Sequence, residues 1–235
     1  MANAPRELKF LLAVPEKKLL QAIARRVPRH WRPNDFTLLG VCSATAAGVA
    51  YALAAQHPAW LWVASAFLVM QWLGDSLDGT LARVRKTERP RYGYYLDHVT
   101  DAYSTAVIGI GLGLSHYVHL GLALGLVVIY LVMSINVYLE TQALGTFKLG
   151  YGLLGPTEVR LLLIAANTGL ALHREVPGSA WPTIATIANA VVALLLLVMV
   201  GLLVARFARN VALLARLEPQ PLRNGAMRPA PAGTH

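Results

Sequence analysis

Long apolar segments separated by short polar turns recur along most of the chain. The six that we identify span residues 36–55, 59–81, 97–115, 118–138, 157–172 and 183–205. Each is close to the length of about 20 residues with which an α-helix crosses the hydrocarbon core of a bilayer. The pattern therefore predicts an all-α fold, that of a polytopic membrane protein with six transmembrane helices.

A different pattern precedes the first span. In residues 15–27 the apolar positions recur at helical spacing and the basic ones lie largely on the other faces. This indicates an amphipathic helix lying in the membrane interface, with an ordinary solvated helix as the alternative. We divide the chain into an N-terminal cytoplasmic segment (1–32), a six-helix domain (33–217), and a tail (218–235) whose Pro, Gly and Ala content predicts disorder.

Composition and charge support a membrane location. The chain is 56% hydrophobic and only 14% charged, which is unusual for a soluble domain. If the N-terminus is cytoplasmic and the spans are even in number, all of the 21 Lys and Arg residues except Arg174 lie at or near the cytoplasmic side. Both termini are then cytoplasmic. A basic face toward anionic lipid accounts for the net charge of +9, so we expect no nucleic-acid partner.

Four aspartates stand out in this apolar sequence, in or beside the second and third spans: Asp75, Asp78, Asp97 and Asp101. Spacings of three and four place both members of each pair on one helical face. Two such helices side by side would bring four carboxylates to one point, which requires a cation among them. Carboxylate oxygens suit Mg²⁺, Mn²⁺ or Ca²⁺. Two such ions about 3.5–4 Å apart can stabilise an in-line displacement at phosphorus.

Small and basic residues accompany the aspartates. Gly79 would let a ligand approach the helix backbone, and Ala82 keeps the same face shallow. Arg83 supplies a cation for a diphosphate, and Gly93 would allow close packing where the third span begins. His98 points to a different helical face from the neighbouring aspartates, so we expect it to pack or to form a peripheral hydrogen bond.

The glycines of 109–113, at every second position, have the spacing of a nucleotide-binding loop. No predicted strand precedes them, so that interpretation fails its structural context. Small residues within a transmembrane helix are typical of close helix packing, within one chain or in a dimer. We expect packing here, and also at Gly121 and Gly125 in the fourth span.

The residues 75–101 resemble the signature of the CDP-alcohol phosphotransferases, Asp-x2-Asp-Gly-x2-Ala-Arg-x8–9-Gly-x3-Asp-x3-Asp, at every fixed position. The six spans and residues 32–40 are also similar to that family. The resemblance implies an integral membrane enzyme that transfers a substituted phosphate from a CDP-alcohol to an acceptor hydroxyl and releases CMP. It also implies membrane-lipid contacts and a homodimer.

The resemblance further implies roles for individual residues. Two divalent ions, Mg²⁺ or Mn²⁺, would be bound by the four aspartates, and Asp101 would also act as the general base. The nucleotide would be bound by a set of residues taken from the same signature: Asp78, Gly79, Ala82, Arg83 and Gly93.

A second resemblance concerns the substrates. Residues 140–150 and 155–159 look similar to eukaryotic choline and ethanolamine phosphotransferases, so we expect transfer from CDP-choline or CDP-ethanolamine to diacylglycerol. Glu140 and Glu158 are then candidates for handling a cationic headgroup or orienting the acceptor, with capping or packing as the alternative. Few cations lie near the membrane in the second half of the chain, which disfavours a phosphorylated acceptor.

Two alternatives remain. The first is a CDP-diacylglycerol-dependent phosphatidyltransferase acting on inositol phosphate, glycerol phosphate or serine. The second, from another class, is a non-catalytic membrane scaffold or a metal-dependent transporter. A transporter is expected to place its charges near mid-membrane, whereas these aspartates cluster toward the predicted cytoplasmic side.

Overall fold

The computed structural model describes residues 12–144, 155–174 and 181–218. Within these ranges the chain forms helices and no strand, which confirms the all-α prediction. The helices are α1 (Ala13–Arg26), α2 (Pro33–Leu53), α3 (Trp60–Arg85), α4 (Pro90–Leu114), α5 (Leu120–Leu144), α6 (Pro156–Arg174) and α7 (Trp181–Leu217). Apart from Glu218, the tail predicted to be disordered lies outside the described residues, and so do residues 145–150 of the stretch on which the substrate prediction rests.

Helix α1 matches the predicted amphipathic segment, and α2 to α7 match the six predicted spans, with four extensions of four residues or more. α3 continues past residue 81 to Arg85, and α4 begins at Pro90 rather than at residue 97. α5 continues past residue 138 to Leu144, and α7 continues past residue 205 to Leu217. Proline suits the first turn of a helix because its missing N–H would have no partner there. The extension of α7 is rich in Ala, Leu and Arg, which favour helix.

Among the residues that the structure describes, three segments are long and apolar enough to cross a membrane by length and composition alone: Pro33–Leu53, Leu120–Leu144 and Ala185–Leu217. The other long helices, α3, α4 and α6, have 26, 25 and 19 residues, close to the roughly 20 that a span requires. They carry the charged and polar residues described below, which lower their mean hydropathy. The chain is a polytopic membrane protein in which the less apolar spans carry the candidate chemistry.

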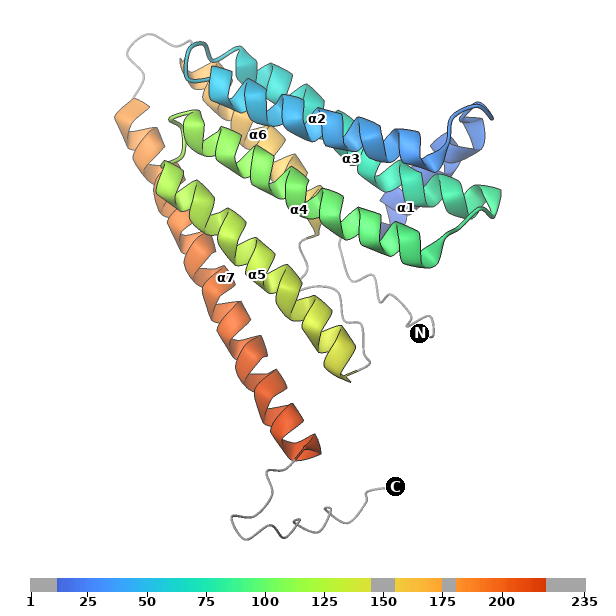
Figure 1. Cartoon of the computed structure of the whole chain (residues 1–235). Helices are drawn as coiled ribbons and strands as arrows, with labels where there is room; N and C mark the ends of the chain where they lie inside the picture. Colours follow the sequence, from blue (N-terminus) through green and yellow to red (C-terminus); the bar gives the residue numbers. More distant parts are fainter. Residues whose placement is uncertain (1–11, 145–154, 175–180, 219–235) are drawn as a thin grey trace, which may run out of the picture.

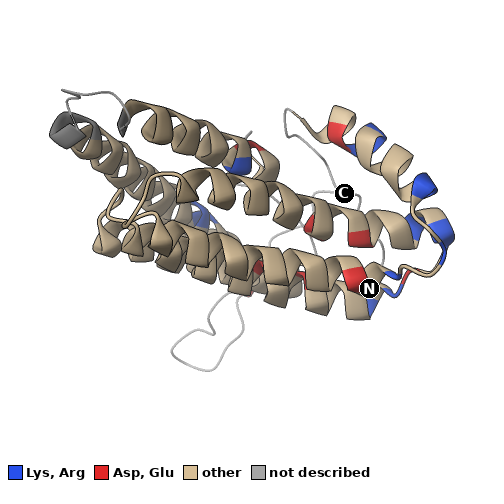
Figure 2. Cartoon of the chain, turned by 90° about the horizontal axis from the view of Figure 1, so that it is seen from above, with Lys and Arg blue, Asp and Glu red and all other residues tan. Residues whose placement is uncertain are grey.

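The helices form two groups that lie at an angle to one another (Figure 1). Helices α2, α3, α4 and α6 run side by side, and α2 packs against both α3 and α4 while α6 packs against α3. Helix α5 packs against α4 and α7 and forms the second group with α7. Figure 2 shows charged residues gathered toward one end of the bundle and a long uncharged stretch of helices toward the other. This is the charge distribution of a protein with one end in the headgroup region.

Glycines allow the first group to pack closely. A Cβ on Gly111 of α4 would overlap the backbone of Gly48 on α2, and a Cβ on Gly74 of α3 would lie 2.5 Å from the backbone nitrogen of Gly40. Helix α2 can therefore lie against both α3 and α4 at backbone distance. The packing role predicted for the glycines of 109–113 is confirmed.

Three polar side chains form hydrogen bonds between helices in the apolar part of the bundle. The side-chain amide of Asn167 on α6 donates to the hydroxyl of Tyr51 on α2 at 2.9 Å and to Ser65 Oγ on α3 at 3.0 Å. All three side chains are buried. Because unpaired polar groups are costly in this environment, these hydrogen bonds define the position of α6 relative to α2 and α3.

Helix α1 lies against α3. Its buried residues Leu20 and Ala24 pack against Leu77 and Leu81. Glu16 Oε1 of α1 accepts hydrogen bonds from Trp72 Nε1 at 2.7 Å and from Thr157 Oγ1 at 2.9 Å, so α1 connects α3 to the first turn of α6.

Candidate metal centre

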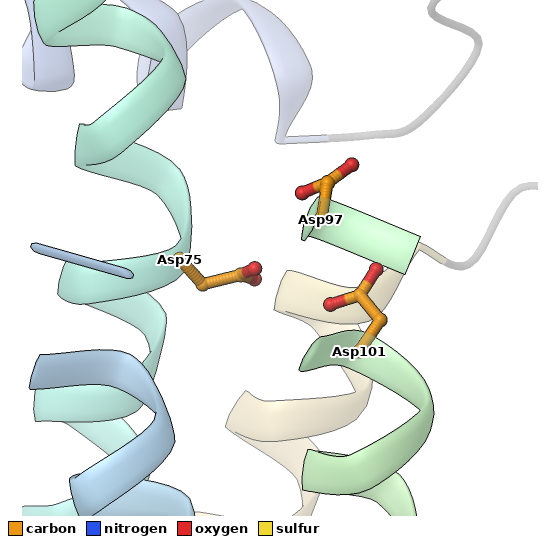
Figure 3. Close-up of side chains that lie close together, drawn as sticks. All are labelled: Asp75, Asp97 and Asp101. Atoms are coloured by element: carbon orange, nitrogen blue, oxygen red, sulfur yellow. The ribbon is translucent and has the colours of Figure 1, made fainter. Parts of the chain in front are cut away.

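Three carboxylates converge between α3 and α4. Asp75 extends from α3 toward Asp97 and Asp101 on α4 (Figure 3), and one oxygen of each lies within 4.8 Å of the others. All three are half-buried. Such a group of anions is unfavourable away from bulk water unless a cation balances it. The oxygen-only set suits a hard divalent ion, so these residues fit the metal that the sequence predicted.

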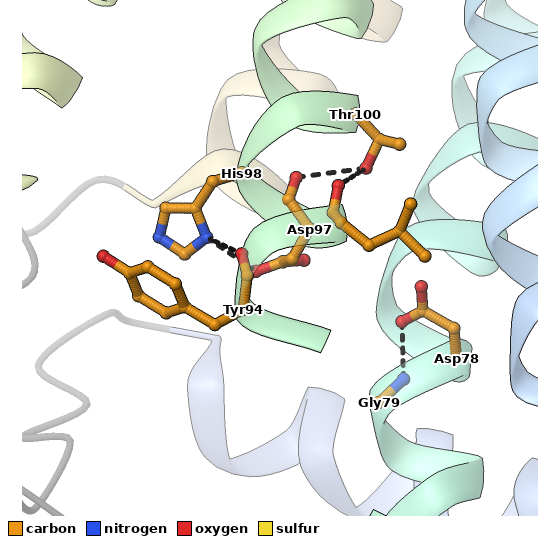
Figure 4. Close-up of polar contacts among 7 residues, drawn as sticks. Asp78, Gly79, Tyr94, Asp97, His98 and Thr100 are labelled. Atoms are coloured by element: carbon orange, nitrogen blue, oxygen red, sulfur yellow. Dashed lines mark hydrogen bonds and ion pairs between the residues drawn. The ribbon is translucent and has the colours of Figure 1, made fainter. Parts of the chain in front are cut away.

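Asp78, the fourth predicted ligand, lies outside this group of three. Its Oδ2 accepts a hydrogen bond of 2.7 Å from the Thr37 hydroxyl on α2, and its Oδ1 accepts one from the backbone N–H of Gly79 (Figure 4). Sequence reasoning therefore placed Asp78 on the correct helix without identifying Thr37 as its partner. The structure brings three of the four predicted carboxylates within ligand distance of one another.

Asp75 and Asp78 share a small polar cavity. It has a volume of about 10 Å³ and is lined by residues of α2, α3 and α4: Thr37, Gly40, Val41, Gln71, Asp75, Asp78, Thr100 and Ser104. The buried side-chain oxygen of Gln71 finds no hydrogen-bond donor within the described part of the chain. A space of this size with several polar partners suits one water molecule or one ligand oxygen. Gln71 lies one turn before Asp75, a position that the aspartate signature does not include.

The centre also includes a cation from a distant part of the sequence. Arg160 Nη2 on α6 donates to Asp75 Oδ2 at 2.7 Å. The sequence showed Arg160 only as one of a few basic residues near the membrane. Its contact depends on how α6 packs against α3, and nothing in the local sequence indicates that packing.

The residues predicted for the nucleotide lie on the adjoining turns of α3 and α4. A Cβ on Gly79 would lie 3.4 Å from Arg83 Nη1, and Arg83 Nη2 donates to Thr80 Oγ1 at 3.1 Å. Gly79, half-buried Ala82 and Arg83 all lie near the C-terminal end of α3. The close packing predicted at Gly93 is wrong for the described chain, because a Cβ there would meet no atom within 4 Å.

His98 lies beside the centre and packs against aromatic residues. Its Nδ1 is 2.8 Å from the carbonyl oxygen of Tyr94 and 3.6 Å from Asp97 Oδ2. Its ring lies 4.1 Å from the Tyr94 ring and 4.7 Å from the Tyr138 ring, between centroids. Figure 4 shows the His98 imidazole beside the ring of Tyr94, which lies one turn earlier on α4. The predicted packing role with a peripheral hydrogen bond is confirmed.

The two predicted headgroup residues form structural contacts. Glu140 on α5 is buried, and its Oε2 accepts hydrogen bonds from Arg206 Nε at 2.7 Å and from Asn210 Nδ2 at 2.8 Å, both on α7. Glu158 accepts hydrogen bonds from the backbone N–H groups of Leu12 at 3.0 Å and Gly155 at 2.9 Å. The Glu158 contact with Gly155 is typical of a helix N-terminus.

Comparison with known proteins gives one family. The sequence model of the CDP-alcohol phosphatidyltransferases matches residues 30–217, a region that contains α2 to α7 and all four aspartates. A search of curated proteins found no match to this chain.

Proposed function

This chain belongs to the CDP-alcohol phosphatidyltransferase family, whose members transfer a phosphate-bearing group from a CDP-alcohol to an acceptor, and we propose which of its residues perform each part of that reaction. The observation that carries the proposal is the convergence of Asp75, Asp97 and Asp101 from two helices. We place the catalytic domain at residues 33–217.

We assign two divalent ions, Mg²⁺ or Mn²⁺, to the four aspartates, with Asp78 completing the set from its position next to Asp75. When bound, such ions neutralise the diphosphate and the charge that develops during displacement at phosphorus. The hydrogen bond from Thr37 restricts the rotation of the Asp78 side chain, which lowers the reorganisation needed when a ligand binds. The aspartates thus hold the nucleotide end of the donor.

Asp101 is the proposed general base. It takes the proton of the acceptor hydroxyl as that oxygen forms its bond to the phosphorus carried by the alcohol. The bond from this phosphorus to the bridging oxygen breaks, and its electron pair leaves with CMP. Asp101 lies one turn further than Asp97 along α4, toward the apolar part of the bundle, which suits an acceptor that enters from the lipid.

The nucleotide is proposed to lie along the end of α3, near Gly79, Ala82 and Arg83. Gly79 leaves the backbone open, and the guanidinium of Arg83 lies close to the Gly79 backbone and is suited to a phosphate oxygen. Gly93, exposed in the first turn of α4 with open space around it, would contribute backbone to the opposite wall.

For the substrates, we propose transfer from CDP-choline or CDP-ethanolamine to diacylglycerol, on the similarity of the residues from 140 to 159 to eukaryotic aminoalcohol phosphotransferases. The contacts of Glu140 and Glu158 favour structural roles for both, so the headgroup assignment rests on that similarity alone. One observation favours the alternative, transfer from CDP-diacylglycerol to a small polar alcohol: Arg160 places a cation at the centre, where a phosphorylated acceptor would need one.

We also propose that the centre and both termini face the cytoplasm, and that the chain forms a homodimer. The orientation is supported by the charge distribution, because the acidic centre lies toward the same end of the bundle as the basic residues of α1 and of the α3–α4 turn (Figure 2). The glycines Gly109 and Gly125 contact residues of their own chain, so the dimer needs a direct test by cross-linking in the membrane.

The deciding experiment measures CMP release by the purified full-length protein with Mg²⁺ or Mn²⁺. CDP-choline and CDP-ethanolamine with diacylglycerol are compared with CDP-diacylglycerol plus serine, inositol phosphate or glycerol phosphate. Asp101→Ala tests the combined role of Asp101 as metal ligand and base. Glu88→Ala, which removes an exposed carboxylate from the α3–α4 turn, is the matched control.

We expect CMP and a zwitterionic lipid from the first set, no turnover by Asp101→Ala and normal turnover by Glu88→Ala. Turnover with the second set alone would reverse donor and acceptor and keep the centre. CMP release that persists in Asp101→Ala would contradict the proposed base.

A further inference from the structure

Arg160 holds a position that a metal ion would also favour. The side chains of Arg160 and Asp75 are 15% and 20% exposed, and Arg160 Nη2 lies 2.7 Å from Asp75 Oδ2. Asp75 belongs to the group of three carboxylates whose oxygens lie within 4.8 Å of one another. The two divalent ions of the proposed function carry four positive charges, equal to the four negative charges of Asp75, Asp78, Asp97 and Asp101 when all are ionised. The charge of Arg160 is then in excess once both ions are bound.

A divalent ion and Arg160 therefore compete for the same anions. Two cations within a few ångströms of one another in a partly buried site repel strongly, because protein screens charge far less than water does. If the ion binds, the guanidinium contact with Asp75 weakens, and the side chain requires another acceptor. The phosphate groups of a nucleotide diphosphate are the acceptors that arrive together with the metal, and guanidinium binds phosphate with two parallel hydrogen bonds.

The start of α6 is held in place, so any such movement is confined to the side chain. Thr157 donates to Glu16 of α1, and Glu158 accepts from Leu12 and from Gly155. These contacts fix the first turn of α6, immediately before Arg160. A long side chain on a fixed backbone can exchange partners by rotamer change alone.

We propose that Arg160 is a built-in counter-cation for the carboxylates. A divalent ion displaces the Arg160 guanidinium from Asp75, and the guanidinium then binds the nucleotide diphosphate. Metal and nucleotide therefore each strengthen the binding of the other. The inference rests on the metal centre of the proposed function. By linkage, the nucleotide raises metal affinity by the same factor as the metal raises nucleotide affinity. Arg160 thus lowers the affinity of the centre for metal until the CDP-alcohol donor is present.

The test is a titration of the full-length protein in lipid nanodiscs with Mn²⁺, following free Mn²⁺ by electron paramagnetic resonance, with and without cytidine diphosphate. Arg160→Met removes the charge and keeps much of the length, and Arg160→Lys keeps the charge. Arg91→Met removes an exposed charge from the first turn of α4 and controls for long-range electrostatics.

Without nucleotide, we expect Arg160→Met to bind Mn²⁺ at least about fivefold more tightly than the unmodified protein, the lower end of typical coupling between sites. Arg160→Lys and Arg91→Met are expected to stay close to the unmodified protein. Cytidine diphosphate should then increase Mn²⁺ affinity less in Arg160→Met than in the unmodified protein. Equal or weaker Mn²⁺ binding by Arg160→Met without nucleotide would overturn the inference, because Arg160 would then only orient Asp75.

The same titration of Asp101→Ala distinguishes a failure of the proposed metal centre from a failure of the proposed role of Arg160. If Asp101→Ala loses Mn²⁺ binding while Arg160→Met behaves as the unmodified protein does, the metal centre stands and the role of Arg160 is wrong. If Asp101→Ala binds Mn²⁺ normally, the ion lies elsewhere, and both the proposed centre and the inference fail.

Discussion

The Thr37 hydroxyl on α2 donates a hydrogen bond of 2.7 Å to Asp78 Oδ2 on α3. This contact brings α2 into a centre whose carboxylates all come from α3 and α4. It also explains why Asp78 lies apart from the other three, since its two oxygens are already bonded to Thr37 and to the Gly79 N–H.

Thr37→Val should therefore lower turnover while leaving the fold intact. Hydrogen bonds to charged groups contribute about 1.5–3 kcal/mol, so we expect a loss of at least about tenfold in kcat/KM. Thr45→Val is the control, because Thr45 lies on the same helix and its hydroxyl contacts Tyr103 rather than an aspartate. Equal activity of the two variants would show that Asp78 needs no support from α2.

The contact of α2 with α3 at Gly40 and Gly74 should tolerate no side chain. Gly74→Ala would place a Cβ 2.5 Å from the Gly40 nitrogen, and overpacking of this kind costs about 1–3 kcal/mol. Because Gly74 precedes Asp75, activity should fall as well. Thermal unfolding in detergent measures the loss. Gly169→Ala on α6, where a Cβ meets nothing within 4 Å, should be neutral or slightly stabilising, because Ala favours helix more than Gly does. A similar loss there would show that the loss in Gly74→Ala does not come from contact with α2.

The Glu140–Arg206 pair should contribute to stability and not to headgroup recognition. Glu140→Gln leaves the Arg206 charge buried without its counter-charge, which costs about 3–5 kcal/mol in comparable buried pairs. We expect a clear drop in the unfolding midpoint, with part of it recovered in the double variant Glu140→Met/Arg206→Met. A Glu140→Gln protein of normal stability but raised KM for a cationic CDP-alcohol would instead assign Glu140 to the headgroup.

Helix α1 should stabilise the start of α6 through Glu16. Glu16→Ala removes the acceptor shared by Trp72 and Thr157, and leaving such groups unpaired costs about 1–3 kcal/mol. We expect faster proteolysis and a lower unfolding midpoint than in Lys17→Ala, which alters an exposed neighbour. If the two variants are cleaved at the same rate, α1 is held by its apolar face alone.

Local sequence was sufficient for several features. The apolar segments predicted the long helices, and the spacing of Asp97 and Asp101 placed both on one face of α4, where the structure has them. The glycines of 109–113 were correctly assigned to packing because no strand precedes them. The ends of the helices were predicted less well, since Pro90 and the residues after 205 extend helix beyond the apolar segments that defined the spans.

Relations between helices depended on the tertiary structure. Helical periodicity determines which residues share a face of one helix, but not how far a neighbouring helix is rotated or shifted along it. Here that relation is determined by backbone contact at Gly48 and Gly111, and by the hydrogen bonds of Asn167. The sequence alone thus determined an all-α membrane protein with an acidic metal signature. Only the packing decided that three carboxylates converge, that Thr37 holds the fourth, and that Arg160 reaches them across 85 residues of sequence.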